Sequence, residues 1–136
     1  MNEEQMNQLR SLPFPAFYYM GMDDELQFVS LEVDKDSPVG ASYVITYSNG
    51  MGGEAQIYGC NGGVGDIMPG EKQVEFSNFL YGGGKAEVYP DGSEEGVKFR
   101  AHWIGNWKNG AYYSFSGKNL GERFIQTVVD GLIELE

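Results

Sequence analysis

Alternation of apolar and small polar residues most constrains the fold of this chain. Residues 41–48 alternate in this way, and residues 96–104 alternate apolar side chains with charged ones. A period of two is typical of a strand with one face on a core and the other in solvent. Asn49-Gly50 follows the first stretch and favours a tight turn, because both residues tolerate positive φ. The chain is therefore expected to form antiparallel strands and not a helix bundle.

Further strands are expected wherever shorter runs of the same pattern lie between turn residues. They fall at residues 26–33, 54–60, 73–81, 85–90 and 111–116, and Gly82-Gly83-Gly84 is expected to separate two of them. The aromatic segment Phe14–Met22, which contains Pro15, is either a first edge strand or a lid over the core.

Two segments carry helical spacing instead. Met6, Leu9 and Leu12 recur every three residues, which predicts a short helix over residues 2–12 that ends before Pro13. The apolar stripe that recurs every four residues predicts an amphipathic helix over roughly residues 119–134. Its members are Leu120, Phe124, Val128 and Leu132.

The expected fold class is therefore α+β, in a single domain over residues 1–136. It has a mostly antiparallel twisted sheet (a meander) of about six or seven strands and a short N-terminal helix. A long amphipathic C-terminal helix packs on one face of the sheet.

Composition restricts the classes of partner. The 136 residues carry 20 acids against 9 bases, a net charge of −11, which argues against a nucleic-acid binder. No apolar run approaches the roughly 20 residues of a membrane helix. The acidic, polar stretch Met1–Gln5 does not resemble a secretory signal, and the single cysteine, Cys60, allows no internal disulfide. We therefore expect a cytoplasmic protein that binds neither nucleic acid nor membrane.

No motif identifies a family or a catalytic site. Gly82-Gly83-Gly84-Lys85 lacks the earlier glycine and the following Ser or Thr of a phosphate loop, and it leads into an expected strand. Cys60 could pair with His102, the only histidine, but a small filler at a strand end is the commoner role for such a cysteine. Neither a cofactor nor a metal site is predicted, because one Cys and one His do not complete a zinc site.

The candidate binding residues are cations and aromatics. Lys98, Arg100 and His102 are expected to point the same way from one strand, either as a binding site or as partners of Glu87 or Glu75 on neighbouring strands. Aromatic residues of the kind enriched at recognition surfaces accompany them. These are Tyr18, Tyr19, Trp103, Trp107, Tyr112 and Tyr113. One tyrosine of each adjacent pair is expected to point away from the core.

Charge is distributed unevenly along the chain, about −8 over residues 1–66 and about −3 over residues 67–136. The favoured function is a non-enzymatic protein-binding domain of the inhibitor, immunity or adaptor type, with a basic protein partner. The alternative is a module for a small apolar or anionic ligand, with an aromatic-lined pocket between the sheet and the C-terminal helix. A homodimer through exposed edge strands is a further possibility.

Overall fold

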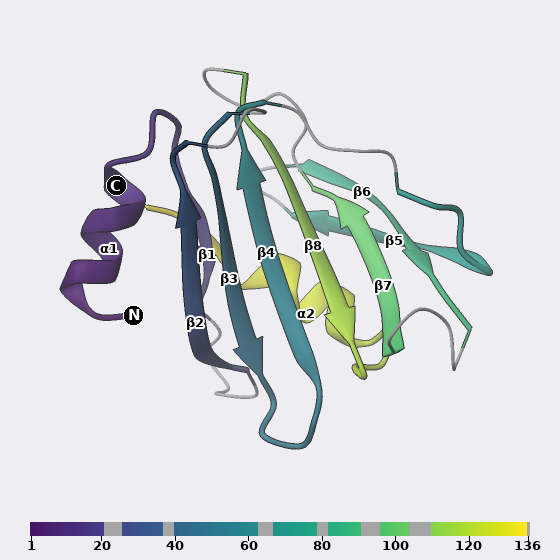
Figure 1. Ribbon diagram of the computed structural model, residues 1–136. Coiled ribbons are helices and arrows are strands. Elements are labelled where there is room, and N and C mark those ends of the chain that lie inside the picture. Colours follow the sequence, from purple (N-terminus) through teal and green to yellow (C-terminus); the bar gives the residue numbers. More distant parts are fainter. Residues whose placement is uncertain are drawn as a thin grey trace.

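The computed structural model describes residues 1–20, 26–36, 40–62, 67–78, 82–90, 96–103 and 110–135 (Figure 1). The elements follow in the order α1 (Glu3–Arg10), β1 (Phe17–Tyr19), β2 (Gln27–Asp34), β3 (Ser42–Ser48), β4 (Glu54–Cys60), β5 (Lys72–Asn78), β6 (Gly82–Val88), β7 (Val97–His102), β8 (Tyr112–Lys118), α2 (Phe124–Asp130) and β9 (Leu132–Glu134). The α+β class and the antiparallel sheet predicted from the sequence are confirmed. Neither helix of the described residues is long and apolar enough to cross a membrane.

Seven strands form one antiparallel sheet in the order β2-β3-β4-β8-β7-β6-β5, while β1 pairs with β9 in a separate two-stranded sheet. Strands that follow one another in the chain pair, except at the centre, where β8 lies between β4 and β7. The large sheet therefore consists of two meanders joined through β4 and β8, and not of one continuous meander. Its two edges are β2 and β5.

The expected hairpin joins β3 to β4. Asn49 shapes its turn, because the Oδ1 atom accepts hydrogen bonds from the N–H groups of Met51 (2.8 Å) and Gly53 (2.9 Å). Gly50 has a φ of 76°, in the left-handed region that favours glycine. Across the hairpin, Ile45 lies opposite Ile57.

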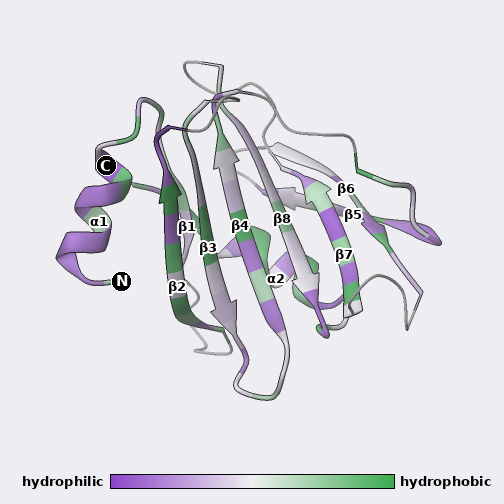
Figure 2. Ribbon diagram, in the orientation of Figure 1, coloured by the Kyte–Doolittle hydropathy of each residue, from purple (hydrophilic) through white to green (hydrophobic). Residues whose placement is uncertain are grey.

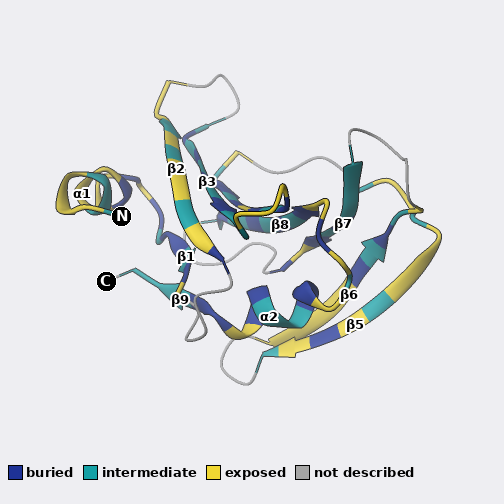
Figure 3. Ribbon diagram, turned by 90° about the horizontal axis from the view of Figure 1, so that it is seen from below, coloured by how far each residue is buried: buried dark blue, intermediate teal, exposed yellow. Residues whose placement is uncertain are grey.

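The sheet is curved, and α2 lies within the curve (Figure 3). The inner face of the sheet carries the core, including Tyr43, Ile45, Tyr47, Ile57, Phe99, Tyr113 and Phe115. From α2, Phe124, Ile125, Val128 and Val129 pack into the same core. The hydropathy colouring shows apolar residues interleaved with polar ones along the strands (Figure 2), as expected for a sheet covered on one side.

The long C-terminal helix predicted over residues 119–134 is wrong. α2 spans Phe124–Asp130, and after Gly131 the chain extends into β9, which pairs with β1. Asn119 adopts a φ of 55°, which a continuous right-handed helix does not tolerate. Leu120 and Leu132 are nevertheless buried. The two ends of the apolar stripe are therefore buried by non-helical segments on either side of α2, although the whole stripe has the spacing of one long helix.

The glycine triplet does not separate two strands. Gly82, Gly83 and Gly84 begin β6, opposite Asn78, Ser77 and Phe76 of β5. A Cβ atom at Gly83 would lie 2.6 Å from the carbonyl oxygen of Phe76. The absence of a side chain therefore permits close contact with the neighbouring backbone, and the triplet is part of the sheet.

Candidate functional site

Arg100 and His102 project from β7 on the outer face of the sheet, away from the core. Arg100 lies opposite Glu87 of β6 on one side and Ser116 of β8 on the other, while His102 lies opposite Ser114. This position suits cross-strand charge pairing, but no ion pair joins Arg100 to Glu87 in the structure, where Glu87 Oε1 accepts from the Gly70 N–H (3.4 Å) and from Gln73 Nε2 (3.4 Å).

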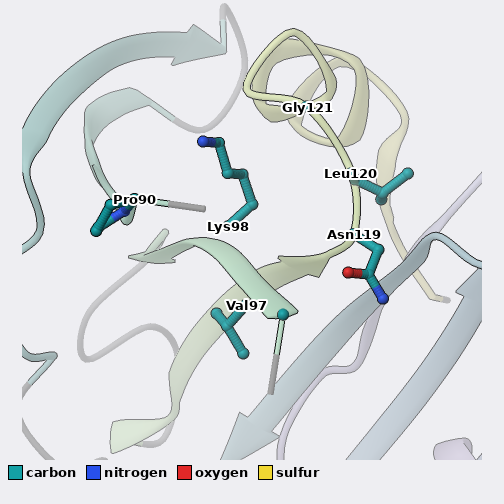
Figure 4. A pocket seen from close by; sticks show the side chains of 7 residues that line it. Pro90, Val97, Lys98, Asn119, Leu120 and Gly121 are labelled. Carbon is teal, nitrogen blue, oxygen red and sulfur yellow. The ribbon is translucent and has the colours of Figure 1, made fainter. Parts of the chain in front are cut away.

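Lys98 does not follow Arg100 and His102. The pairing of β7 with β8 changes register between Val97 and Phe99, which interrupts the alternation of side chains at Lys98. Figure 4 shows Lys98 and Val97 pointing in opposite directions, with Lys98 on the side of α2. The three cations therefore do not form one stripe. The pocket that Lys98 lines has a volume of about 320 Å³, and its other lining residues are Pro90, Gly96, Val97, Asn119, Leu120 and Gly121.

The predicted aromatic residues are divided between two faces. Trp103, Tyr113 and Tyr19 are buried in the core, while Tyr112 and Tyr18 are only half-buried. Each adjacent pair thus has one member pointing away from the core, as expected. Trp107 lies outside the described residues. Of the described aromatic residues, Tyr112 lies on the same outer face as Arg100 and His102, whereas Trp103, Tyr113 and Tyr19 lie in the core.

The inner-face tyrosines bind the N-terminal segment through their hydroxyl groups. The Phe17 N–H donates to the Tyr43 hydroxyl (2.8 Å), which itself donates to the Phe17 carbonyl oxygen (2.8 Å). The Tyr19 N–H donates to the Tyr47 hydroxyl (2.9 Å), and the Tyr113 hydroxyl donates to the carbonyl oxygen of Pro15. These bonds satisfy backbone groups of β1 that β9 does not reach, so their role is to hold the fold.

Burial raises the pKa of Tyr43, Tyr47 and Tyr113 above the ordinary value of 10.0. The hydrogen bonds that Tyr43 and Tyr47 make with the backbone oppose this effect and are outweighed by burial. All three hydroxyls therefore stay protonated, and able to donate, throughout the physiological pH range.

A cysteine–histidine site is not assembled. Cys60 ends β4 and His102 ends β7, and β8 lies between these two strands. Strands about 4.8 Å apart place the two residues on the order of 10 Å from each other, beyond hydrogen-bond reach. Cys60 is buried, its Sγ atom accepts from the N–H of Gly62 (3.2 Å), and burial together with the hydrogen bond to Cys60 raises the pKa of Tyr58 to about 12. Within the part of the chain that the structure describes, no group of three or more His, Cys, Asp or Glu residues could hold a metal ion.

α1 lies beside the edge strand β2 (Figures 1 and 3), and both elements carry exposed carboxylates. We call this surface the acidic edge; it comprises Glu3, Glu4, Glu32, Asp34 and Asp36, all exposed. Glu3 and Glu4 lie in the first turn of α1, where a carboxylate interacts favourably with the positive end of the helix dipole. Arg10 and Lys35 are the only cations in residues 1–66 of the sequence. Both are exposed, on α1 and directly after β2, so the five carboxylates of the acidic edge outnumber its two cations.

A groove opens between α1 and the beginning of β2, with a volume of about 300 Å³. Its lining is mostly apolar and includes three methionines, so we call it the methionine groove. It is lined by Met1, Met6, Tyr18, Tyr19, Met20, Leu26, Gln27, Phe28 and Tyr47. The Met20 side chain is 57% exposed. Methionine side chains adapt to varied apolar partners, because they are unbranched and polarisable.

Sequence reasoning identified the charge asymmetry but missed both of these surfaces. The sequence shows the excess of acids in residues 1–66. That some of these acids lie at an edge of the sheet depends on the position of β2 in the strand order. The groove joins residues from α1, β1, β2 and β3, which no local pattern connects.

Comparison with known proteins adds no assignment: no family model, curated protein or solved structure matches the chain.

Proposed function

We propose that the protein is a non-enzymatic binding domain for a basic protein partner, of the inhibitor, immunity or adaptor type, and that the acidic edge is its docking surface. The observation that carries this proposal is the presence of five exposed carboxylates on α1, on β2 and directly after β2. A surface of one sign steers an oppositely charged partner and raises the rate of encounter.

The acidic edge is also the accessible edge of the sheet. Among the described residues, β2 pairs only with β3, and no other segment makes a backbone–backbone hydrogen bond with it. The opposite edge, β5, is bonded to the side chain of Gln126 in α2 and to that of Glu122 just before α2. α1 packs beside β2 without a backbone hydrogen bond to it, so a partner at this edge would not have to displace backbone bonds from another described element.

The test is affinity capture at low salt with two charge-reversed baits beside the wild type. Glu32→Lys with Asp34→Lys reverses the acidic edge, while Glu71→Lys with Glu75→Lys makes the same change in net charge near β5. We expect the first variant and 0.5 M salt each to slow association about tenfold or more. The second variant should retain the same partner. Equal retention by both variants, or loss from both, would contradict the proposal.

A second candidate function is binding of a small ligand, and the pocket at Lys98 favours it. Lys98 places a positive charge at a cavity of about 320 Å³, which lies at the lower limit of small-molecule pockets. Native mass spectrometry of freshly purified protein should then show a ligand-bound mass, and Lys98→Met should abolish it. A ligand-free mass with no thermal shift across an anion library would remove this candidate.

A further inference from the structure

We propose that the outer face of β7 and β8 binds a phosphorylated side chain of a partner protein. The site is a set of four hydrogen-bond donors, Arg100 and His102 on β7 with Ser114 and Ser116 on β8, which we call the donor array. The donor array lies on a different surface from the acidic edge. The inference therefore goes beyond the proposed function and does not depend on it.

Strand alternation places all four side chains of the donor array on one face of the sheet. Phe99 and Ala101 of β7 are buried in the core, as are Tyr113 and Phe115 of β8, so the residues that alternate with them point outward. Figure 1 views the sheet from this side, with α2 behind it, and no other described element lies in front of β7 and β8. The donor array is therefore open to a partner.

The register of the two strands arranges the donor array as a rectangle. Arg100 lies opposite Ser116, and His102 lies opposite Ser114. Opposite residues of antiparallel strands have Cβ atoms about 4.5–5.5 Å apart, and alternate residues of one strand are about 6.6 Å apart. A tetrahedral oxyanion centred above the rectangle is therefore within reach of all four side chains.

The side chains of the donor array have no partner in the part of the chain that the structure describes, since none of them makes a hydrogen bond or an ion pair. Glu87, which lies opposite Arg100 on β6, directs its Oε1 atom instead to the Gly70 N–H and to Gln73, at 3.4 Å each. Arg100 is half-buried, and an anion that accepts from its guanidinium N–H groups would form strong, charge-assisted hydrogen bonds.

The net charge of −11 does not prevent an anion from binding at this site. β7 is four strands away from β2 in the sheet order, which is about 19 Å at about 4.8 Å per strand. Exposed charges further apart than the Debye length, about 8 Å at physiological ionic strength, are largely screened from each other. The acidic edge therefore has little effect at the donor array, where Glu87 is the acid on the adjoining strand.

The number and type of donors favour a phosphoryl group over a carboxylate. An arginine donates two parallel N–H bonds to phosphate oxygens, while the two hydroxyl groups and the imidazole can each donate one more. A phosphate monoester presents three terminal oxygens and a charge of about −1.5 to −2. A carboxylate has only two oxygens and one negative charge, so it would leave donors of the array unused.

A partner protein is a better source of the phosphoryl group than a small phosphate ester. Small ligands are held in concave sites that bury most of their surface, and neither the Lys98 pocket nor the methionine groove includes a residue of the donor array. A phosphorylated protein segment can add contacts along the open face. On β4, next to β8, Tyr58 lies opposite Ser114 and Gln56 lies opposite Ser116.

The experiment titrates the full chain with two probes and follows the Arg100 side chain by NMR. The probes are inorganic phosphate and a pool of nine-residue peptides with phosphoserine at the centre and random residues on both sides. Pools with Ser or Glu at the centre are the controls. The phosphoserine pool should shift the Arg100 Nε–H signal and the amide signals of Ser114 and Ser116, and the Ser pool should shift neither. Peptides selected from the phosphoserine pool should bind about tenfold more tightly than inorganic phosphate.

Four variants test which groups bind the selected phosphopeptides. Arg100→Gln should weaken binding about tenfold or more, and Arg100→Lys, which keeps the charge but loses the planar fork, about fivefold. Glu87→Gln removes the adjoining carboxylate and should strengthen binding about twofold. Lys35→Gln makes the same change in net charge as Arg100→Gln at a distant exposed site, and should leave affinity unchanged. Thermal unfolding of each variant checks that it folds.

Three results would overturn the inference. Shifts with inorganic phosphate but no preference for the phosphoserine pool over the Glu pool would mean an adventitious ion only. Full affinity in Arg100→Lys would show that net charge, and not the donor array, attracts the peptides. Free O-phosphoserine that binds as tightly as the selected peptides would refute the assignment to a partner protein.

The outcomes are independent of the test of the proposed function. The Glu32→Lys, Asp34→Lys variant, which reverses the acidic edge, should bind the phosphopeptides with the affinity of the wild type. Loss of phosphopeptide binding in that variant would contradict the location of the site on β7 and β8. Retention of phosphopeptide binding, together with unchanged capture of a basic partner, would support the donor array and refute the acidic edge.

Discussion

The two edges of the seven-stranded sheet are protected in different ways. At β5, Lys72 forms an ion pair with Glu122 (2.9 Å), and the Gln126 side chain bonds both the N–H (3.2 Å) and the carbonyl oxygen (2.8 Å) of Ser77. At β2 the described residues show no such bonds from another element, and exposed carboxylates lie along the strand. Both arrangements discourage uncontrolled strand pairing.

The difference shows which edge can receive a partner. A backbone group that is already bonded to α2 is unavailable, because a new partner would first have to displace Gln126. A strand guarded by carboxylates repels a second copy of itself but attracts a basic segment. The two edges also differ in the contacts of the elements beneath them. Buried tyrosine hydroxyls hold β1 on the β2 side, whereas the exposed Gln126 side chain holds α2 on the β5 side.

Alkaline pH should have the largest effect, and it should act on the β2 side first. The unfolded tyrosines ionise near pH 10, while the raised pKa of Tyr43 and Tyr47 keeps them protonated in the folded state. The folded state then binds more protons, so stability is fully present below pH 10 and falls as pH rises. Each of these two residues should lower the free energy of unfolding by about 1.4 kcal/mol per pH unit.

Urea unfolding between pH 8 and 11.5 measures this slope, and hydrogen exchange locates it. Amides of β1 should lose protection before those of α2. Equal loss of amide protection in β1 and α2, or a free energy of unfolding that does not change above pH 10, would contradict this difference between the two sides.

Removal of one buried hydroxyl should have the next largest effect. Tyr43→Phe leaves the N–H and carbonyl of Phe17 without the partner that serves both, which should lower the free energy of unfolding by about 1–3 kcal/mol. Tyr112→Phe, at a half-buried site on the outer face, should change it by less than about 0.5 kcal/mol. Chemical denaturation of both variants measures the difference, and similar costs would argue against a special role for the inner hydroxyls.

Disruption of the β5 edge should cost less. Gln126→Ala removes both bonds to Ser77 at an exposed site and should lower the free energy of unfolding by about 0.5–1.5 kcal/mol. Faster exchange of the Ser77 amide should accompany this loss. Gln27→Ala at the β2 edge is the matched control and should be nearly neutral. A larger effect at Gln27 would reverse the comparison between the edges.

The ion pair at β5 should contribute least. The side chains of Lys72 and Glu122 are 53% and 42% exposed, and pairs of this kind stabilise by about 0–1 kcal/mol. Lys72→Met should therefore change the thermal midpoint only slightly, and the change should disappear in 1 M salt. A salt-independent loss would indicate that the aliphatic part of Lys72 packs against α2.

The sequence predicted the parts of the fold that depend on local patterns. The alternation over residues 41–48 and the Asn49-Gly50 turn correctly indicated β3 and β4, because the period of two and the turn residues lie within one short segment. The C-terminal helix was overextended, because a four-residue apolar period does not reveal that the helix begins only at Phe124 and ends before Gly131, or that β9 pairs with the distant β1.

The candidate site was harder to predict, since it depends on register and strand order. A register shift turns Lys98 away from Arg100, and no change in the residue pattern marks it. The acidic residues were visible as a bias in composition, but only the place of β2 at the edge of the sheet makes them a surface. Exposure of the groove methionines follows from packing between separate elements.

The central pairing of β4 with β8 also bears on how the chain folds. It joins residues more than fifty positions apart, such as Cys60 and Tyr112. During synthesis, the β2-β3-β4 meander emerges from the ribosome first. The edge of β4 that pairs with β8 then lacks its hydrogen-bond partners until residues 112–118 follow. Pairing of segments so far apart in the chain is slow, because closing the long loop between them costs entropy. The unpaired β2-β3-β4 meander is therefore the species on which a chaperone would act. A translational pause between these segments would lengthen the time for which β4 is unpaired.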